Sequence, residues 1–372
     1  MSDGCDVLVV GGGPAGLATA IALRQRGAEV VVMDATRPPV DKPCGEGLMP
    51  DSLRALAGLG VEPDSRCGGE FRGILFAGDG AEAAAEFPSG AGLGVRRTEL
   101  HKLLRQRAET LGVRMRWNTP ITLREGESAA AGGEKLAYRW LVGADGQASR
   151  VRAWAGLDTQ RIRSRRFGHR AHFRIRGWSP YVEIHWGERG QAYVTPVSRD
   201  EICVSAMTRE PGIRLGEIVA AIPTLRERLA GAEQSSAERG ALTTTRRLRR
   251  VASGNVALVG DASGSADAIT GEGLAMSFRQ ALLLAESLAA GSLDLYVGRH
   301  GAILDLPQRM ASLMLLLDRY AGLRARVLRV LEARPRLFAG MLAVHVGEQP
   351  MPRFVLRHGA ELGALLLAPR LA

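Results

Sequence analysis

The sequence predicts an α/β protein with three parts: a domain built on a parallel sheet, a smaller domain built on an antiparallel sheet, and a helical C-terminal region. Three observations support this fold class. A strand, glycine-rich loop, helix and second strand follow one another at the N-terminus, apolar residues alternate with period two in the middle, and helical patterns run from Leu293 onward. The 372 residues, 46% of them hydrophobic, suffice for two or three domains.

The N-terminal segment carries the strongest local signal. Val7–Val10 is an unbroken apolar run, as expected of a strand buried on both faces. Gly11, Gly13 and Gly16 follow with the spacing G-x-G-x-x-G, then a helical pattern, and then a second apolar run that ends at Asp34. This order is typical of a Rossmann-type unit, in which the helix N-terminus faces a pyrophosphate and the acidic residue binds a ribose.

Three further motifs follow in a fixed order. A helix is predicted to begin near Arg97, an apolar strand ends in Asp145-Gly146, and another strand ends in Gly260-Asp261 ahead of the turn Thr270–Gly273. Together with the N-terminal motif, they resemble the one-Rossmann flavoprotein family. This family includes the para-hydroxybenzoate-hydroxylase-like (class A) monooxygenases and the geranylgeranyl reductases. The resemblance covers about residues 5–290 and implies a Rossmann-type FAD-binding domain.

Two loops are similar to the geranylgeranyl-reductase-like branch of this family. Lys42–Leu48 reads Lys-Pro-Cys-Gly-Glu-Gly-Leu, close to that branch's Lys-Pro-Cys-Gly-Gly loop, and Thr270–Gly273 matches its Thr-Gly-Glu-Gly turn. Phenol hydroxylases usually carry a Pro pair in the second of these two loops, and this chain lacks the pair there. The Trp-x-Trp-x-Ile-Pro signature of flavin halogenases is also absent from the sequence, which disfavours chlorination.

The resemblance implies FAD as cofactor and NAD(P)H as a transient co-substrate, because the sequence holds only one dinucleotide-binding fingerprint. It assigns the pyrophosphate to the glycine loop, the ribose to Asp34, and the N1–C2=O edge of the flavin to backbone N–H groups after Thr270. The residues expected to bind FAD are Gly11, Gly13, Pro14, Ala15, Gly16, Asp34, Ala35, Lys42, Cys44, Gly45, Arg97, Asp261, Gly271, Glu272, Gly273 and Leu274. No metal site is expected, because no Cys or His pair has metal-ligand spacing.

Cys44 is the candidate catalytic residue. In the reductase-like branch, a cysteine beside the flavin is suspected of a catalytic part. The alternative is a small side chain that permits close packing beside the flavin. Asp145 has two readings as well: a residue that stabilises a turn, or a part of the nicotinamide path.

The middle of the chain is predicted to form an antiparallel sheet, and the resemblance implies that this sheet binds the substrate and covers the flavin. Its candidate substrate contacts are His172, Arg174, His185, Tyr193 and Thr195. We expect a discontinuous FAD-binding domain at 1–75, 95–157 and 250–292, a substrate domain at 76–94 and 158–249, and a C-terminal helical region at 293–372.

Charge and composition limit the partners. The net charge is +10, which suits an anionic partner or a solvated basic surface. Aromatic residues make up 5% and no nucleic-acid-binding motif is present, so nucleic acid is excluded. No apolar run approaches the ~18 residues of a membrane span, and the N-terminus is unlike a signal peptide. We expect a cytoplasmic protein, with peripheral membrane contact through the C-terminal helices as an alternative.

The sequence therefore predicts an FAD-dependent, NAD(P)H-using oxidoreductase. The leading hypothesis is a monooxygenase that uses molecular oxygen to hydroxylate an apolar aromatic or polyketide-like small molecule. The alternative is a geranylgeranyl-reductase-like enzyme that reduces carbon–carbon double bonds of a prenyl lipid. A non-catalytic FAD-binding module is a minor alternative.

Overall fold

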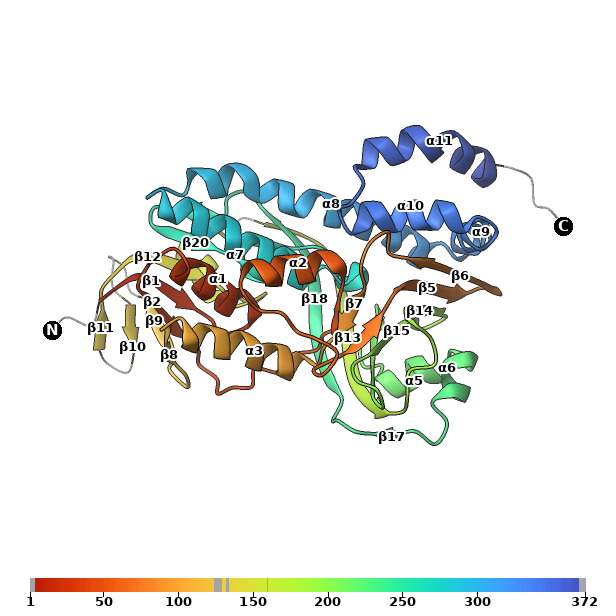
Figure 1. Ribbon diagram of the computed structural model, residues 1–372, viewed down its shortest axis with the longest axis horizontal. Coiled ribbons are helices and arrows are strands. Elements are labelled where there is room, and N and C mark those ends of the chain that lie inside the picture. Colours follow the sequence, from red (N-terminus) through yellow and green to blue (C-terminus); the bar gives the residue numbers. More distant parts are fainter. Residues whose placement is uncertain (1–3, 124–128, 132–133, 159, 368–372) are drawn as a thin grey trace.

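The computed structural model describes residues 4–123, 129–131, 134–158 and 160–367. Two sheets lie side by side along the longest axis of the molecule (Figure 1). The N-terminal end holds a parallel sheet between helices, and the other end holds a large, mostly antiparallel sheet. The predicted α/β class is therefore confirmed.

The parallel sheet has the strand order β19-β20-β12-β1-β2-β8. Only the edge pair β19–β20 is antiparallel. Val7, Leu8 and Val9 of β1 are all buried, which explains the unbroken apolar run. The strands are β1 (Cys5–Val10), β2 (Val30–Met33), β8 (Arg114–Arg116), β12 (Tyr138–Gly143), β19 (Ala252–Ser253) and β20 (Val256–Leu258).

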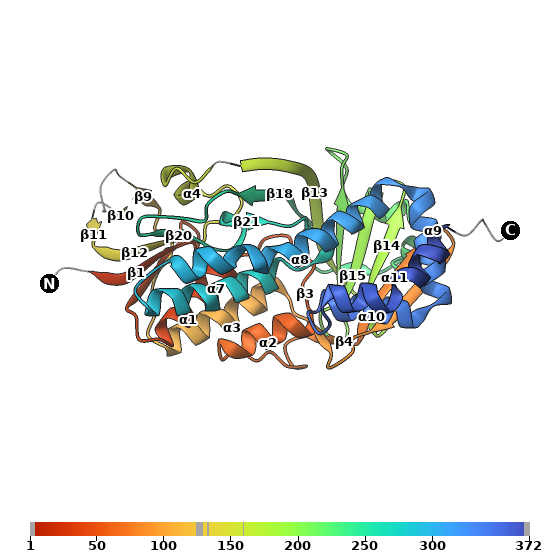
Figure 2. The ribbon, with the colours of Figure 1, turned by 90° about the horizontal axis from the view of Figure 1, so that it is seen from above.

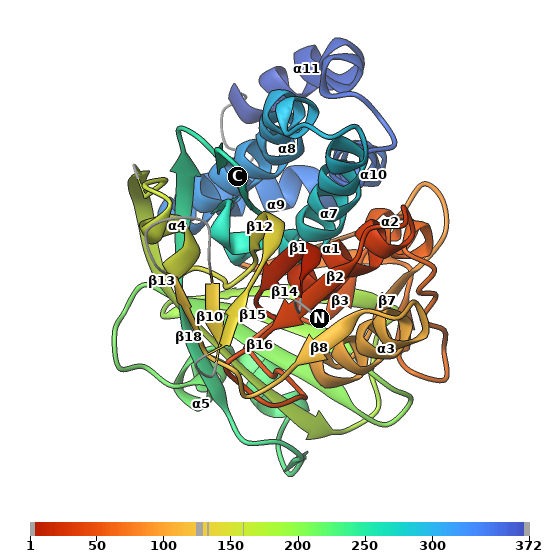
Figure 3. The ribbon, with the colours of Figure 1, turned by 90° about the vertical axis from the view of Figure 1, so that its left-hand side faces the viewer.

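Helices cover one face of this sheet, and a short helix with a small sheet covers the other (Figure 3). One face packs on α1 (Pro14–Arg24), α3 (Arg97–Thr110) and α7 (Gly273–Ala289), with α2 (Pro50–Gly58) beside α7. The opposite face packs on α4 (Arg150–Trp154) and on a small sheet. That small sheet consists of β9 (Ile121–Leu123), β10 (Ala129–Ala131) and β11 (Glu134–Leu136).

The large sheet has the order β21-β18-β13-β16-β15-β14-β5-β6, with β17 paired to β13. Its predicted period-two pattern is confirmed, because Ile202, Val204 and Ala206 all face α5 (Leu215–Ala220) and α6 (Pro223–Arg228). The strands are β5 (Gly73–Gly78), β6 (Ala81–Glu86), β13 (Gln160–Arg174), β14 (Tyr181–Gly187), β15 (Gly190–Pro196), β16 (Ile202–Thr208), β17 (Glu233–Gln234), β18 (Arg239–Leu248) and β21 (Gly264–Ser265).

A second small sheet joins the two halves of the molecule. It contains β3 (Gly47–Leu48), β7 (Gly92–Gly94) and β4 (Gly69–Phe71), in the order β3-β7-β4. The division of the chain into domains stays a proposal, and β5 runs across its boundary at 75/76.

The C-terminal region is helical, as predicted. It forms α8 (Asp294–Arg319), α9 (Ala321–Ala333), α10 (Pro335–His345) and α11 (Met351–Leu367). Helix α8 runs from the parallel sheet to the large sheet, where α9 to α11 gather (Figure 2). Among the described helices, none has both the length and the apolar run that a membrane crossing requires.

Candidate functional site

The loop after β1 is shaped by three glycines. Gly11 has a φ of 109°, and a Cβ there would lie 2.4 Å from the Ala144 carbonyl oxygen. A Cβ on Gly16 would lie 1.8 Å from the Gly11 carbonyl oxygen, so both positions need glycine. Gly13 differs, because a Cβ there meets no atom within 4 Å. The open space at Gly13, directly before α1, suits a phosphate bound by backbone N–H groups.

Asp34 braces this loop from the end of β2. Its Oδ2 accepts the Gly12 N–H at 2.7 Å, and its Oδ1 accepts hydrogen bonds from the N–H and hydroxyl of Thr36 at 2.7 and 2.6 Å. The Asp34 side chain is only half-buried, so it remains within reach of a ligand that lies along the loop. Its neighbour Ala35 is exposed.

His101 also supports the loop, and the sequence analysis missed it. Burial lowers the pKa of His101. The ring is therefore neutral near pH 7, and we assign the proton to Nε2, which donates to the Gly12 carbonyl oxygen at 2.9 Å. His101 lies one turn after Arg97 on α3, a spacing that could have drawn attention to it.

A second polar group surrounds Asp261, which follows β20. Asp261 remains accessible to solvent, yet the protein around it partly removes water from its carboxyl and raises its pKa. The positive charges of Arg97, Lys42 and Arg246 oppose this shift. Within the described part of the chain, Nε of Arg97 has no hydrogen-bond partner although it is buried. A cation with a spare donor beside an accessible carboxylate fits the phosphates and hydroxyls of FAD.

The glycine-rich turn lies between the short helix η2 (Ala268–Thr270) and α7. Gly271 has a φ of 70°, and a Cβ on Gly271 or Gly273 would meet no atom within 4 Å. Both residues are exposed, and Leu274 is half-buried. The space in front of the α7 N-terminus can therefore take a group with negative charge.

The Glu272 side chain points away from this space. It is buried, and its Oε2 lies 3.7 Å from Nδ1 of His345 on α10. Burial raises the pKa of Glu272, and the nearby His345 lowers it. Glu272 is among the residues expected to bind FAD, and only its backbone lies at the turn.

Residues 42–46, which we call the Cys44 loop, reach toward the same region. Cys44 is half-buried, and its Sγ accepts the Glu46 N–H at 3.4 Å. Gly45 and Lys42 are exposed. The Lys42 side chain extends toward Gly146, because a Cβ on Gly146 would lie 3.5 Å from Nζ of Lys42. All four cysteines are free.

Asp145 has a structural role at the beginning of α4. Its Oδ2 accepts the N–H groups of Arg150 and Val151, at 2.7 and 3.2 Å. This arrangement supports the interpretation of Asp145 as a residue that stabilises a turn.

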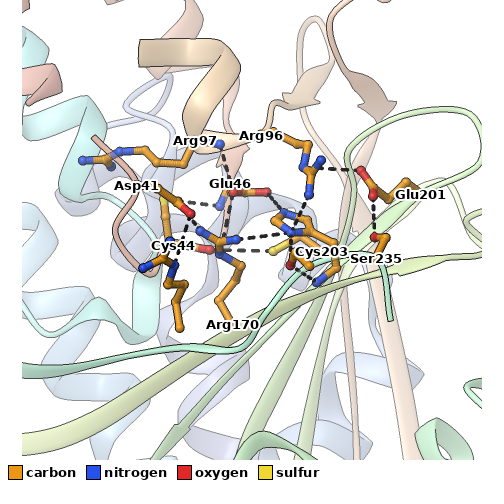
Figure 4. A network of polar contacts seen from close by, with 12 residues as sticks. Asp41, Cys44, Glu46, Arg96, Arg97, Arg170, Glu201, Cys203 and Ser235 are labelled. Atoms are coloured by element: carbon orange, nitrogen blue, oxygen red, sulfur yellow. Dashed lines mark hydrogen bonds and ion pairs between the residues drawn. The ribbon is translucent and has the colours of Figure 1, made fainter. Parts of the chain in front are cut away.

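Glu46 is the main residue that sequence reasoning missed. It is buried with a φ of 61°, and its Oε1 accepts the Arg97 N–H at 2.9 Å (Figure 4). Its Oε2 lies 2.7 Å from Nε2 of His172. A guanidinium can only donate, and Arg96 and Arg170 contact Nδ1 of His172 at 3.0 and 3.2 Å. Nδ1 must therefore accept, which places the His172 proton on Nε2, where it is donated to Glu46.

Cys203 completes a buried cluster with these two residues. Glu46, His172 and Cys203 offer potential metal-ligand atoms within 4.8 Å of one another. Burial raises the pKa of the Cys203 thiol well above its usual value, with a further contribution from Glu46, and its Sγ donates to the Cys44 carbonyl oxygen at 3.7 Å. A protonated thiol and a hydrogen-bonded Glu–His pair fit a polar support for the Cys44 loop better than a metal centre.

The candidate substrate residues do not all share one face of the large sheet. Register places His172 opposite Cys203, and Cys203 opposite Thr195, which lies on the same side as Tyr193. His185 lies on the other face, where its Nε2 contacts Glu183 at 2.8 Å. Arg174 pairs at the surface with Glu233.

Buried apolar side chains, which we call the apolar wall, pack beside the Cys44 loop and the glycine-rich turn. The wall belongs to a buried cluster shared by the large sheet and the C-terminal helices. Five residues of this cluster lie close to the two loops, either along the chain or on a neighbouring strand of the sheet: Met49, Phe71, Tyr193, Ile269 and Met276.

The fold and this donor set define a flavoprotein oxidoreductase. Residues 4–292 match the family described as "FAD binding domain", and the chain belongs to that family. The resemblance inferred from the motifs is thereby confirmed, and the protein is an FAD-dependent oxidoreductase.

Individual relatives are similar at low identity. A menaquinone reductase from Mycobacterium tuberculosis is 26% identical over 358 residues, which cover 84% of this chain and 85% of that protein. A chloroplastic geranylgeranyl diphosphate reductase from Oryza sativa is 28% identical over 77% of this chain and 66% of its own length. A flavin-dependent brominase superposes with a TM-score of 0.77 at 19% identity, covering 97% of this chain and 99% of that one, which supports the fold alone.

Proposed function

We propose that this enzyme is an NAD(P)H-using monooxygenase that hydroxylates an apolar aromatic or polyketide-like small molecule. The observation that carries the proposal is the apolar wall beside the Cys44 loop and the Gly271–Gly273 turn. Both loops are the ones assigned to the flavin, so a substrate that reaches the flavin must meet this wall. Apolar side chains packed around that place favour an apolar substrate.

Different residues of the chain would bind different parts of FAD. The open turn at Gly13 and the α1 N-terminus would hold the pyrophosphate, and Asp34 would hold the adenosine ribose. Arg97 and Asp261 would bind the polar chain between the two ring systems. Backbone N–H groups at Gly271 and Gly273 would face the flavin ring. Bound FAD supplies two-electron redox chemistry and reactivity toward oxygen.

Reduction of prenyl double bonds is the second candidate. It is favoured by the Lys42–Leu48 and Thr270–Gly273 loops and by the similarity to a menaquinone reductase and a geranylgeranyl diphosphate reductase. The apolar wall suits a prenyl chain as well as an aromatic ring. The candidates differ in where the electrons go: to oxygen in one and to a carbon–carbon bond in the other.

Isotopes separate the two reactions. The enzyme is incubated with NADPH and ¹⁸O₂ beside a panel of long-chain phenols, and with deuterated NADPH and prenyl quinones without oxygen. Incorporation of ¹⁸O into a phenol supports the monooxygenase. A product with two hydrogens added to its prenyl chain, as distinct from reduction of the quinone ring to a quinol, and with no oxygen added supports the reductase. If neither panel gives a product while the bound flavin is reduced by NADPH, the assigned substrate classes are wrong.

A further inference from the structure

Glu46 adopts a backbone conformation that side chains rarely take. Its φ of 61° falls in the left-handed region, where glycine is favoured. A similar loop in the reductase-like branch of the family has glycine at this position. Here a glutamate is kept in a strained conformation, and strain persists where the surrounding contacts require it.

The contacts of Glu46 join three separate segments. Its N–H and carbonyl oxygen hold the Cys44 loop, through the Cys44 Sγ and the Val95 N–H at 3.4 and 2.8 Å. Its carboxylate accepts the first N–H of α3, from Arg97 at 2.9 Å. The same carboxylate accepts the proton of His172 on β13 of the large sheet at 2.7 Å.

His172 is itself fixed in place. Arg96 and Arg170 donate to its Nδ1, and each is anchored by an acid, Glu201 at 3.4 Å from Nε of Arg96 and Asp41 beside Arg170. Figure 4 shows this network between the Cys44 loop, the beginning of α3 and the large sheet. Both the imidazole and the Glu46 carboxylate are 1% exposed, so water cannot replace either partner.

We propose that Glu46 is a positioning residue that couples the FAD site to the substrate-binding sheet. Through Arg97 and the Cys44 loop it senses whether FAD is bound, and through His172 it fixes β13. FAD binding and the order of β13 therefore stabilise each other. This inference rests on the proposed placement of FAD and not on the choice between hydroxylation and reduction.

The network predicts that glutamine cannot replace Glu46. One amide oxygen can accept either the Arg97 N–H or the His172 Nε2–H, and its NH₂ group then faces the other donor. A proton on Nδ1 of His172 could be donated to the Ser236 hydroxyl at 2.8 Å, but it would then face the two donating guanidinium groups of Arg96 and Arg170, which opposes this rearrangement. Glu46→Gln therefore breaks one of the two links whichever way the amide turns.

Glu183→Gln is the matched control. Glu183 and His185 form another buried Glu–His pair on the same sheet, with a similar contact of 2.8 Å between Nε2 and Oε2, but on the face toward α6. This variant loses an equivalent buried pair with no link to α3 or to the Cys44 loop.

The full chain is first freed of FAD. Its affinity for added FAD is measured by fluorescence titration, and the hydrogen exchange of β13 is measured with and without FAD. Neither readout needs turnover. In the wild type and in Glu183→Gln, FAD is expected to slow exchange in β13. In Glu46→Gln this protection is expected to disappear and the FAD Kd to rise about tenfold. His172→Gln should give the same result, and the double variant should be no worse than either single one.

Three results would overturn the proposal. The first is an FAD Kd of Glu46→Gln within twofold of wild type, and the second is unchanged protection of β13 from exchange in that variant. The third is an equal loss of FAD affinity and β13 protection in Glu183→Gln, which would indicate a general effect of stability. If Glu46→Gln does not fold, Glu46→Gly is measured against the same expectations, because glycine suits the φ of 61° while removing the carboxylate.

Discussion

Arg166 and Asp267 form an ion pair at 3.2 Å, and both side chains are 1% exposed. The same Asp267 oxygen accepts the N–H of Ile269 at 3.1 Å, just before the glycine-rich turn. The pair thus fastens that turn to β13, with Gln191 contributing a further contact to Arg166 at 3.1 Å. The glycine-rich turn and the large sheet are consequently joined at a second point, distinct from Glu46.

Removing the Asp267 charge is expected to cost stability. Asp267→Asn leaves the buried Arg166 charge without its carboxylate at 3.2 Å, and losing one partner of a buried pair costs about 3 kcal/mol. Asp318, at 3.8 Å, compensates only partly. Urea unfolding measures the change in the free energy of unfolding. A loss below about 0.5 kcal/mol, the usual range for a surface substitution, would contradict this prediction.

The two glycines of the N-terminal loop should respond differently to a side chain. Gly13→Val should fold normally, since a Cβ there meets no atom, but its isopropyl group should occupy the pyrophosphate space and weaken FAD binding by about a hundredfold. Gly16→Ala places a Cβ 1.8 Å from the Gly11 carbonyl oxygen and should lower the melting temperature instead. Flavin absorbance and thermal melts of both proteins distinguish the effects. A Gly13→Val protein that purifies fully loaded with FAD would refute the assignment.

Cys44→Ser tests whether the thiol takes part in the reaction. If Cys44 only permits close packing, the variant should bind FAD and keep turnover within about twofold of wild type, because serine has a similar volume. Cys203→Ser is the control, since Cys203 is buried and faces the same loop. Normal flavin reduction with abolished product formation in Cys44→Ser alone would instead give the thiol a chemical role.

His300 should make the fold sensitive to acid. Burial lowers the pKa of His300 from 6.5 to about 4. The folded state therefore binds this proton less readily than the unfolded state, and stability that is complete above pH 6.5 is lost as the pH falls toward 4. The loss approaches about 3 kcal/mol. His300→Gln should flatten the dependence of unfolding free energy on pH in this interval. An identical slope in the variant would show that other groups cause the acid sensitivity.

The parts of the site that follow a local rule could be predicted from sequence. Gly11, Gly13 and Gly16 obey a fixed spacing after a strand, and Asp34 ends the next one, so the loop and its brace are visible in a single segment. The antiparallel sheet was likewise visible in the alternation of Ile202, Val204 and Ala206.

The supporting residues could not be predicted, because their partners are distant in sequence. Glu46 meets His172 across 126 positions, and His101 meets Gly12 across 89. Such contacts depend on how the sheet and α3 pack, and the local cue in the sequence is the position of His101 one turn after Arg97. The burial of the Glu272 side chain against His345 has the same cause, since α10 follows more than 60 residues later in a different part of the fold.

One measurement tests the central claim most directly. FAD-loaded enzyme is incubated with NADPH, oxygen and a long-chain phenol. We would measure three amounts in the same reaction: the NADPH oxidised, the oxygen consumed and the hydroxylated product formed. The account predicts that the three amounts rise together in near-equal proportion when a suitable apolar phenol is present. The account is contradicted if oxygen is converted only to hydrogen peroxide with every phenol while the prenyl double bonds of prenyl quinones are reduced without oxygen.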